Sequence, residues 1–236
     1  MTSANRDFLR QKTVAVLGGT SGIGREVARA AAEAGAQVYV LGRSAAQAGP
    51  WQHLHADVTD PQSLRQAFAE IGRIDHLVLT AGARVGSPRL EDATVDDFRK
   101  TFEVKLFGNL LAAQQALPYL AADASITFTS GLLARKYGAG GLLKSTVNAA
   151  LEAATKNLAK ELAPRRVNAV SPGVVDTELW GEAGAEGRTA AMAKIGAGLP
   201  LGRVGQPREL AEAYLFAMGN AFVTGAVLDV DGGGLL

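Results

Sequence analysis

Short apolar segments alternate along the whole chain with longer segments of mixed character. The short segments are rich in Val, Ile and Leu and are apolar on both faces, which is typical of strands buried in a parallel sheet. Helix-like segments fill the gaps. The pattern therefore predicts an α/β fold: a single doubly wound, Rossmann-type domain over residues 1–236, with helices on both faces of the sheet. The seven expected parallel strands are 13–17, 37–41, 52–56, 74–80, 125–130, 166–171 and 226–230.

Start and stop signals mark five expected helices. Gly35 ends the first, the pair Asp60-Pro61 opens the second, and Thr94 followed by Asp97 resembles a capping box for the third. The expected helices cover 23–34, 60–70, about 94–120, about 140–162 and about 207–218. Residues 181–200 follow no such pattern, and most of this segment is rich in Gly and Ala. It is expected to be either a lid over a substrate site or a surface insertion.

A glycine-rich turn joins the first expected strand to the first expected helix. Glycine lets the backbone turn tightly and approach a pyrophosphate, while free N–H groups and the helix dipole hold the negative charge. The spacing is G-x-x-x-G-x-G, and the strand, turn and helix fall where this mechanism requires them. The predicted cofactor-binding residues of the turn are Gly18, Thr20, Ser21, Gly22, Ile23 and Gly24.

The second expected strand is followed by Arg43 and Ser44. In dinucleotide-binding folds an acidic residue at this tip binds the adenine-ribose hydroxyls, whereas an arginine accommodates a 2′-phosphate. No acid stands here, so Arg43 favours NADP(H) over NAD(H); the alternative is an ordinary surface arginine. Asp57 and Val58, just past the third strand, are expected at the edge where the adenine ring rests.

These features resemble the short-chain dehydrogenase/reductase family, and the likeness covers essentially the whole chain. Residues 18–24 look like the glycine motif of the family, and Asp57-Val58 looks like its adenine-contacting pair. Ala81-Gly82 stands at the end of the family's N-N-A-G segment, in which both asparagines are replaced here. Residues 200–203, 224–225 and 230–233 match its C-terminal pattern.

One further segment, 171–177, is similar to the family's P-G-x-x-x-T, which closes over the nicotinamide. The resemblance therefore implies cofactor contacts from Pro172, Gly173, Val175 and Thr177, together with Ala81. It also implies a contact from Gly82.

The resemblance implies a catalytic set of Asn, Ser, Tyr and Lys, and this chain keeps only part of it. In the family the Tyr protonates the substrate oxygen, the Ser positions that oxygen, the Lys binds the nicotinamide ribose, and the Asn holds a relay water. Lys144 matches the lysine, and Ser130 matches the serine. Gly140 stands in the place of the tyrosine, and Lys105 in the place of the asparagine.

Two residues are candidates for the missing proton donor. Tyr137 lies on the loop before Gly140 and is able to swing its hydroxyl into the site; the alternative is an aromatic side chain that packs on the loop. Lys105 becomes a competent acid if it shares a pocket with Lys144, because like charge and desolvation lower an ammonium pKa. The alternative is a lysine whose stem packs on the helix while its head reaches water.

Composition narrows the function classes. The chain has 24 Lys+Arg, 23 Asp+Glu and a net charge of +1, which gives no electrostatic case for nucleic acid or an anionic membrane. It has no Cys, so disulfides and thiolate catalysis are excluded, and its three histidines lack metal-ligand spacing, so no metal is expected. The absence of a long apolar run and of an apolar block near residue 1 makes a cytoplasmic location the default expectation.

The leading hypothesis is an NADP(H)-dependent reductase or dehydrogenase that acts on a small-molecule carbonyl or alcohol. Two others remain open: a dinucleotide-binding protein without turnover, serving as a sensor or assembly subunit, and a non-redox enzyme such as one that opens epoxides. The Ala-rich helices expected at 104–120 and 140–162 allow close packing. By resemblance they imply a homodimer or homotetramer, and packing within a monomer is the alternative.

Overall fold

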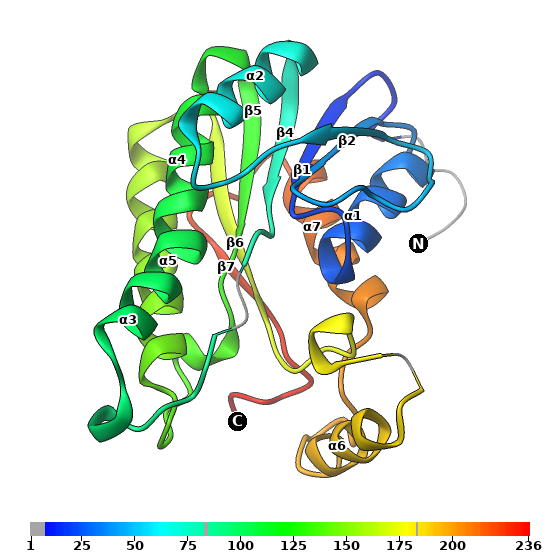
Figure 1. The fold of residues 1–236 in the computed structure, drawn as a ribbon. Coiled ribbons are helices and arrows are strands. Elements are labelled where there is room, and N and C mark those ends of the chain that lie inside the picture. Colours follow the sequence, from blue (N-terminus) through cyan, green and yellow to red (C-terminus); the bar gives the residue numbers. More distant parts are fainter. Residues whose placement is uncertain (1–7, 83–84, 183) are drawn as a thin grey trace.

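The computed structural model of this protein describes residues 8–82, 85–182 and 184–236. Within these ranges a parallel sheet of seven strands runs through the molecule (Figure 1). Every expected strand is present, which confirms the α/β class and the Rossmann-type sheet. The strands are β1 (Thr13–Leu17), β2 (Gln37–Gly42), β3 (Gln52–His55), β4 (Ile74–Leu79), β5 (Leu120–Thr129), β6 (Arg166–Pro172) and β7 (Val227–Val230).

The strand order is β3-β2-β1-β4-β5-β6-β7, and it reverses between β1 and β4. From β1 the chain builds outward through β2 to β3, and it then returns to β4 and builds outward on the other side. In an open parallel sheet, a crevice forms at this switch point, beyond the carboxyl ends of the strands. The turn after β1 and the loop after β4 therefore meet at one edge of the sheet.

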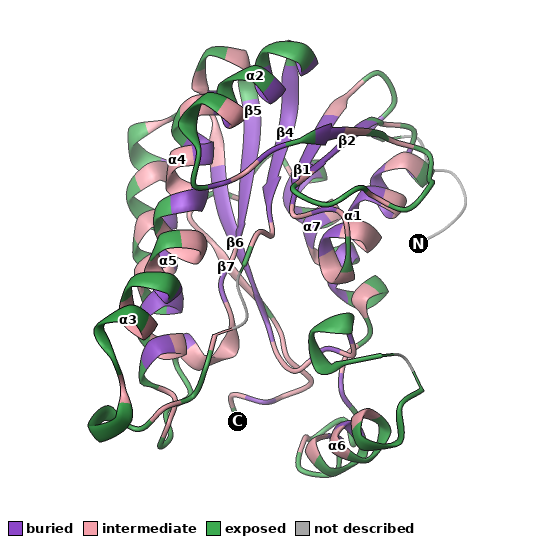
Figure 2. Cartoon of the chain, in the orientation of Figure 1, coloured by how far each residue is buried: buried purple, intermediate pink, exposed green. Residues whose placement is uncertain are grey.

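Helices cover both faces of the sheet, as expected. Helices α2, α4 and α5 pack on one apolar layer, which includes Leu17, Leu77 and Phe128. Helices α1 and α7 pack on the other, which includes Val16 and Val78. Figure 2 shows the strands buried between these two layers. The bounds are α1 (Gly22–Glu33), α2 (Pro61–Ile71), α4 (Asn109–Ala116), α5 (Leu142–Glu161) and α7 (Pro207–Gly219).

The segment expected as one helix over about 94–120 is divided into pieces. It opens with α3 (Val95–Phe102) on the expected capping box: Asp97 N donates to Thr94 Oγ1 at 3.2 Å, and Thr94 N donates to Asp97 Oδ2 at 2.9 Å. A π-helical turn over Glu103–Gly108 separates α3 from α4. A 3-10 turn over Leu117–Tyr119 then ends the segment before β5. A π turn holds one extra residue, which hydrophobic periodicity does not reveal.

The segment 181–200 contains a helix that its weak pattern did not predict, α6 (Glu186–Gly196). Only Met192 and Gly196 of this helix are buried, and α6 lies beside the carboxyl ends of the strands in Figure 1. Residue 183 of this segment lies outside the described residues. So do residues 1–7, on which part of the expectation about a missing signal peptide falls.

Candidate cofactor and catalytic site

The turn after β1 contains glycines that leave no room for a side chain at its closest contacts. A Cβ on Gly24 would lie 2.4 Å from both Gly18 O and Thr80 Oγ1, so no side chain is tolerated where the turn meets the end of β4. Thr80 Oγ1 also donates to Leu17 O at 2.9 Å, which ties β4 to the base of the turn. The N–H groups of Gly18 and Gly19 are held within the fold by Leu41 O and Val16 O, so the donors left for a ligand lie farther along the turn, toward the start of α1.

An anionic group already lies at the N-terminus of α1. Ser21 is the N-cap residue, but its side chain makes no capping hydrogen bond. Gly22 N donates instead to Glu178 Oε2 at 3.1 Å. A carboxylate oxygen thus stands in for the phosphate oxygen that such a helix start binds, and the site fits a dinucleotide diphosphate on this observation. Thr20 and Ile23 are half-buried beside it.

The residues expected around the adenosine meet at one corner. Arg43 and Ser44 are exposed directly after β2. Asp57 Oδ1 accepts hydrogen bonds from Thr59 N at 2.9 Å and from Thr59 Oγ1 at 2.8 Å. The Thr59 backbone bond and the nearby Arg43 charge both lower the pKa of Asp57. Val58 is buried, so of this pair the carboxylate of Asp57 is the more open to solvent.

The segment that follows β6 returns to the glycine turn. Pro172 ends β6, Gly173 follows it, and Val175 forms an isolated parallel bridge with the chain near the start of α7. Thr177 is 9% exposed, and its Cγ2 lies 3.5 Å from where a Cβ on Gly22 would stand. Residues 172–177 and the glycine turn, far apart in sequence, therefore form one wall of the crevice.

Lys105 lies in the π-helical turn and faces the end of β5. Its Nζ donates to Ser130 O at 3.1 Å. Desolvation, helped by the positive charge of Lys144, lowers the pKa of Lys105 to about 8. Lys144 Nζ, from the first turns of α5, donates to Ser87 Oγ at 2.6 Å. The structure thus brings the two lysines within electrostatic reach of each other at one corner.

Asn109 was not singled out by the sequence, yet it holds this corner in place. It is 2% exposed, and its Nδ2 donates to Lys105 O and to Ala81 O, both at 2.9 Å. These bonds join the π turn to the loop after β4, where Gly82 follows Ala81. A polar amide within an otherwise apolar helix run was the available signal, because a buried amide needs hydrogen-bond partners.

Ser130 binds the Lys105 ammonium with its backbone carbonyl oxygen and not with its hydroxyl. The Ser130 Oγ donates to Glu152 Oε1 at 2.9 Å and to Asn148 O at 3.3 Å, both on α5. Arg135 pairs with the other oxygen of Glu152 at 3.3 Å. The hydroxyl is therefore engaged with α5, and the carbonyl is the group turned toward the Lys105 ammonium.

The place of the missing tyrosine is closed by the chain itself. Gly140 has φ of +74°, and a Cβ there would lie 2.7 Å from Ser87 O. A tyrosine at position 140 would collide with this backbone. Tyr137, on the loop between β5 and α5, is 78% exposed. Of the two candidate proton donors, Lys105 is half-buried at the site and Tyr137 extends into solvent.

The described residues form neither a metal-binding cluster nor a membrane-spanning helix. Among the described residues, no group of three or more His, Cys, Asp or Glu side chains is placed to hold a metal ion. No helix in the described part of the chain is both long and apolar enough to cross a bilayer. His76 Nδ1 lies 2.8 Å from Ser125 Oγ, and burial lowers the pKa of His76 to about 4, so this histidine is a neutral core residue.

Comparisons with known proteins agree with this geometry. A family model described as enoyl-(acyl carrier protein) reductase matches residues 18–234. The chain is 33% identical to the short-chain dehydrogenase/reductase ATR9 of Stachybotrys chlorohalonatus, over 97% of this chain and 98% of that one. It is also 33% identical to carbonyl reductase family member 4 of Danio rerio, over 92% and 95%. A solved small-chain dehydrogenase in complex with NADPH superposes with a TM-score of 0.85 at 40% identity, over 95% and 98%.

Proposed function

The chain belongs to the short-chain dehydrogenase/reductase family of oxidoreductases, and we propose that it transfers hydride between NADP(H) and a small carbonyl or alcohol, with Lys105 as the proton donor. One observation carries this proposal: the Lys105 ammonium lies at the end of β5 with its pKa lowered to about 8. A tyrosine has no room at position 140, so the proton must come from elsewhere.

This chain's residues would hold the cofactor at four places. The glycine turn and the N-terminus of α1 would bind the diphosphate, and Arg43 with Ser44 would bind the 2′-phosphate. Asp57 and Val58 would contact the adenine. The nicotinamide half would lie against Ala81, Gly82, Lys144 and residues 172–177. When bound, the nicotinamide supplies or accepts the hydride. The preference for NADP(H) is supported by Arg43 and by the NADPH of the solved relative.

Lys105 would act as the general acid. Reduction builds negative charge on the substrate oxygen, which needs a proton and a nearby positive charge. An ammonium with pKa of about 8 is still mostly protonated at pH 7, and it gives up its proton far more readily than an ordinary lysine. The bond from Lys105 Nζ to Ser130 O orients the ammonium, so Ser130 acts here as a positioning residue.

The decisive experiment follows NADPH oxidation with a panel of small aldehydes and ketones, using the wild type, Lys105→Met and Tyr137→Phe. We expect Lys105→Met to lose about 10²–10⁴-fold in kcat, the usual contribution of a positioned acid. Tyr137→Phe is the control and should keep wild-type rates. The opposite result would transfer the role to Tyr137.

The same panel separates catalysis from binding alone. If NADPH binds with no turnover on any substrate, the chain is a dinucleotide-binding protein without redox activity. The role of residues 181–200 as a substrate lid stays a prediction; the mostly exposed α6 is consistent with it. Assembly into a homodimer or homotetramer also stays a prediction, which sedimentation at two or more protein concentrations will test.

A further inference from the structure

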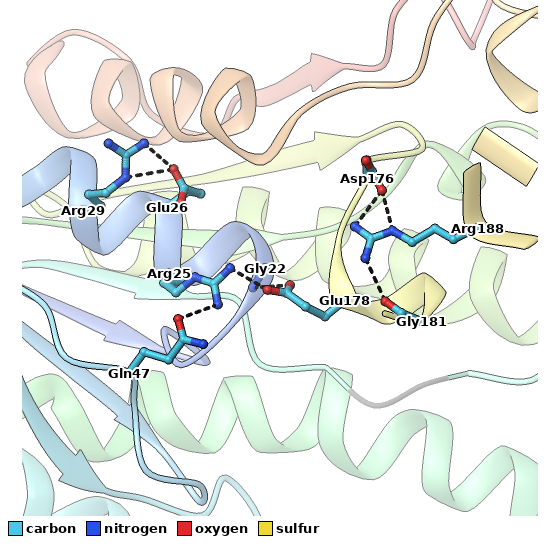
Figure 3. A network of polar contacts seen from close by, with 9 residues as sticks. All are labelled: Gly22, Arg25, Glu26, Arg29, Gln47, Asp176, Glu178, Gly181 and Arg188. Carbon is cyan, nitrogen blue, oxygen red and sulfur yellow. Dashed lines mark hydrogen bonds and ion pairs between the residues drawn. The ribbon is translucent and has the colours of Figure 1, made fainter. Parts of the chain in front are cut away.

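The carboxylate of Glu178 occupies the anion-binding end of α1 (Figure 3). One oxygen accepts from Gly22 N at 3.1 Å, and the other accepts from Arg25 Nη2 at 2.5 Å. Arg25 also reaches Gln47, on the loop after β2, at 3.4 Å. Glu178 therefore binds one N–H group of the glycine turn and the guanidinium of Arg25 on α1.

The short helix that carries Glu178 is itself held by contacts on its other side. Glu178 begins a one-turn 3-10 helix, Glu178–Trp180, directly after Thr177. On the far side of this helix, Arg188 Nε donates to Asp176 Oδ1 at 2.7 Å and Arg188 Nη1 donates to Gly181 O at 2.8 Å. Figure 3 shows these two sets of contacts on either side of the short helix. The backbone that carries Glu178 is thus anchored at both ends.

We propose that Glu178 is an anionic latch that holds the diphosphate position until a dinucleotide displaces it. The inference rests on the proposed function for the identity of the ligand. The Gly22 N–H has a single proton to donate, so it cannot serve a carboxylate and a phosphate oxygen together. When the diphosphate arrives, Glu178 leaves, and the Arg25 guanidinium becomes a cofactor-binding group that pairs with a phosphate.

The exchange links the cofactor to the substrate side of the site. Residues 178–180 lead into the segment 181–200, so the Glu178 contact joins the cofactor side of the site to the start of the expected lid. The latch also reduces the apparent affinity for the cofactor. Only molecules in which Glu178 has left the α1 N-terminus can bind it, so the apparent affinity is the intrinsic affinity multiplied by the fraction of such molecules.

The first test measures dinucleotide affinity by calorimetry on the wild type, Glu178→Ala and Glu182→Ala. Glu182 is an exposed carboxylate four residues farther on and serves as the matched control for net charge. We expect Glu178→Ala to bind NADPH about three- to tenfold more tightly, the range that a charged contact of this exposure supports. Glu182→Ala should match the wild type. Unchanged or weaker binding by Glu178→Ala would overturn the latch.

The second test observes the movement itself. The chain has two tryptophans, Trp51 and Trp180, so a Trp51→Phe background reports on Trp180 alone. The probe is 2′-phospho-ADP-ribose, which carries the diphosphate but no nicotinamide. A saturating concentration of this probe should shift the wavelength of Trp180 emission in the Glu178-containing protein. The Glu178→Ala variant should show nearly the shifted wavelength without the probe and should change little when the probe is added. An emission that does not move in the Glu178-containing protein contradicts the proposal.

Different results contradict the proposed function and the Glu178 latch. If neither the wild type nor Glu178→Ala binds a pyridine nucleotide, the proposed function is wrong and the latch falls with it. If the wild type binds NADPH but Glu178→Ala gains no affinity, only the latch is wrong.

Discussion

The glycine turn and the catalytic corner are two binding regions built in opposite ways. The turn uses backbone atoms from one stretch of chain, Gly18–Gly24, in which Gly18 and Gly24 pack closely on Thr80. The catalytic corner uses side chains from three elements: Lys105 on the π turn, Ser130 after β5 and Lys144 on α5. The identity of the turn is specified by neighbouring residues in the chain, whereas the catalytic corner exists only when three separate elements pack together.

The largest expected effect is at the turn, with Gly24→Ala. The new methyl would collide with Gly18 O and Thr80 Oγ1, so we expect a loss of about 3 kcal/mol in unfolding free energy and no measurable NADPH binding. Urea unfolding and calorimetry measure both. Gly138→Ala is the control, because no atom lies within 4 Å of the Cβ that it would add. Equal behaviour of the two variants would show that the turn is not closely packed.

A smaller effect is expected from Arg43→Ala, which tests the cofactor side without touching the corner. Loss of a charged hydrogen bond to the 2′-phosphate should weaken NADPH binding about tenfold or more and leave NADH binding unchanged. The exposed Arg208, on α7, gives a matched control as Arg208→Ala. If Arg43→Ala weakened NADPH and NADH binding by the same factor, Arg43 would contribute only a non-specific positive charge and no contact to the 2′-phosphate.

The catalytic corner should respond to pH. Carbonyl reduction needs protonated Lys105, so its rate should fall about tenfold per pH unit above about 8, whereas alcohol oxidation needs the neutral amine and should rise through the same pH. Lys144→Met removes a charge that lowers the pKa of Lys105, so the midpoint should move to higher pH whatever happens to the maximal rate. A midpoint that stays in place would remove Lys105 from the proton step.

The smallest expected effect concerns the N-caps of two helices: α1, which follows the glycine turn, and α3, which leads into the π turn that carries Lys105. Thr94 caps α3 with its side chain, so Thr94→Ala should cost about 1 kcal/mol of unfolding free energy while NADPH affinity stays the same. Ser21 makes no side-chain cap on α1, so Ser21→Ala should leave stability nearly unchanged. Unfolding curves and calorimetry on both variants test this contrast. A stability loss at Ser21 as large as that at Thr94 would contradict it.

Much of the fold could be read from the sequence because burial on both faces leaves a local trace. Strands such as β1 and β2 appear as short apolar runs, and the helix caps at Asp60 and Thr94 appear as local motifs. The failures have a physical reason too. The π turn at Glu103–Gly108 adds one residue without changing the polar pattern, and α6 buries too little surface to need an amphipathic stripe.

By itself, the sequence determined the parallel α/β sheet, the glycine turn and the family, because each is specified by residues that are neighbours in the chain. Only the tertiary structure decided which atoms meet at the site. Glu178 lies at the start of α1, 156 positions from Gly22, and Ser130 turns its carbonyl rather than its hydroxyl to Lys105. Such contacts depend on the packing of elements distant in sequence, and no local pattern of residue types records that packing.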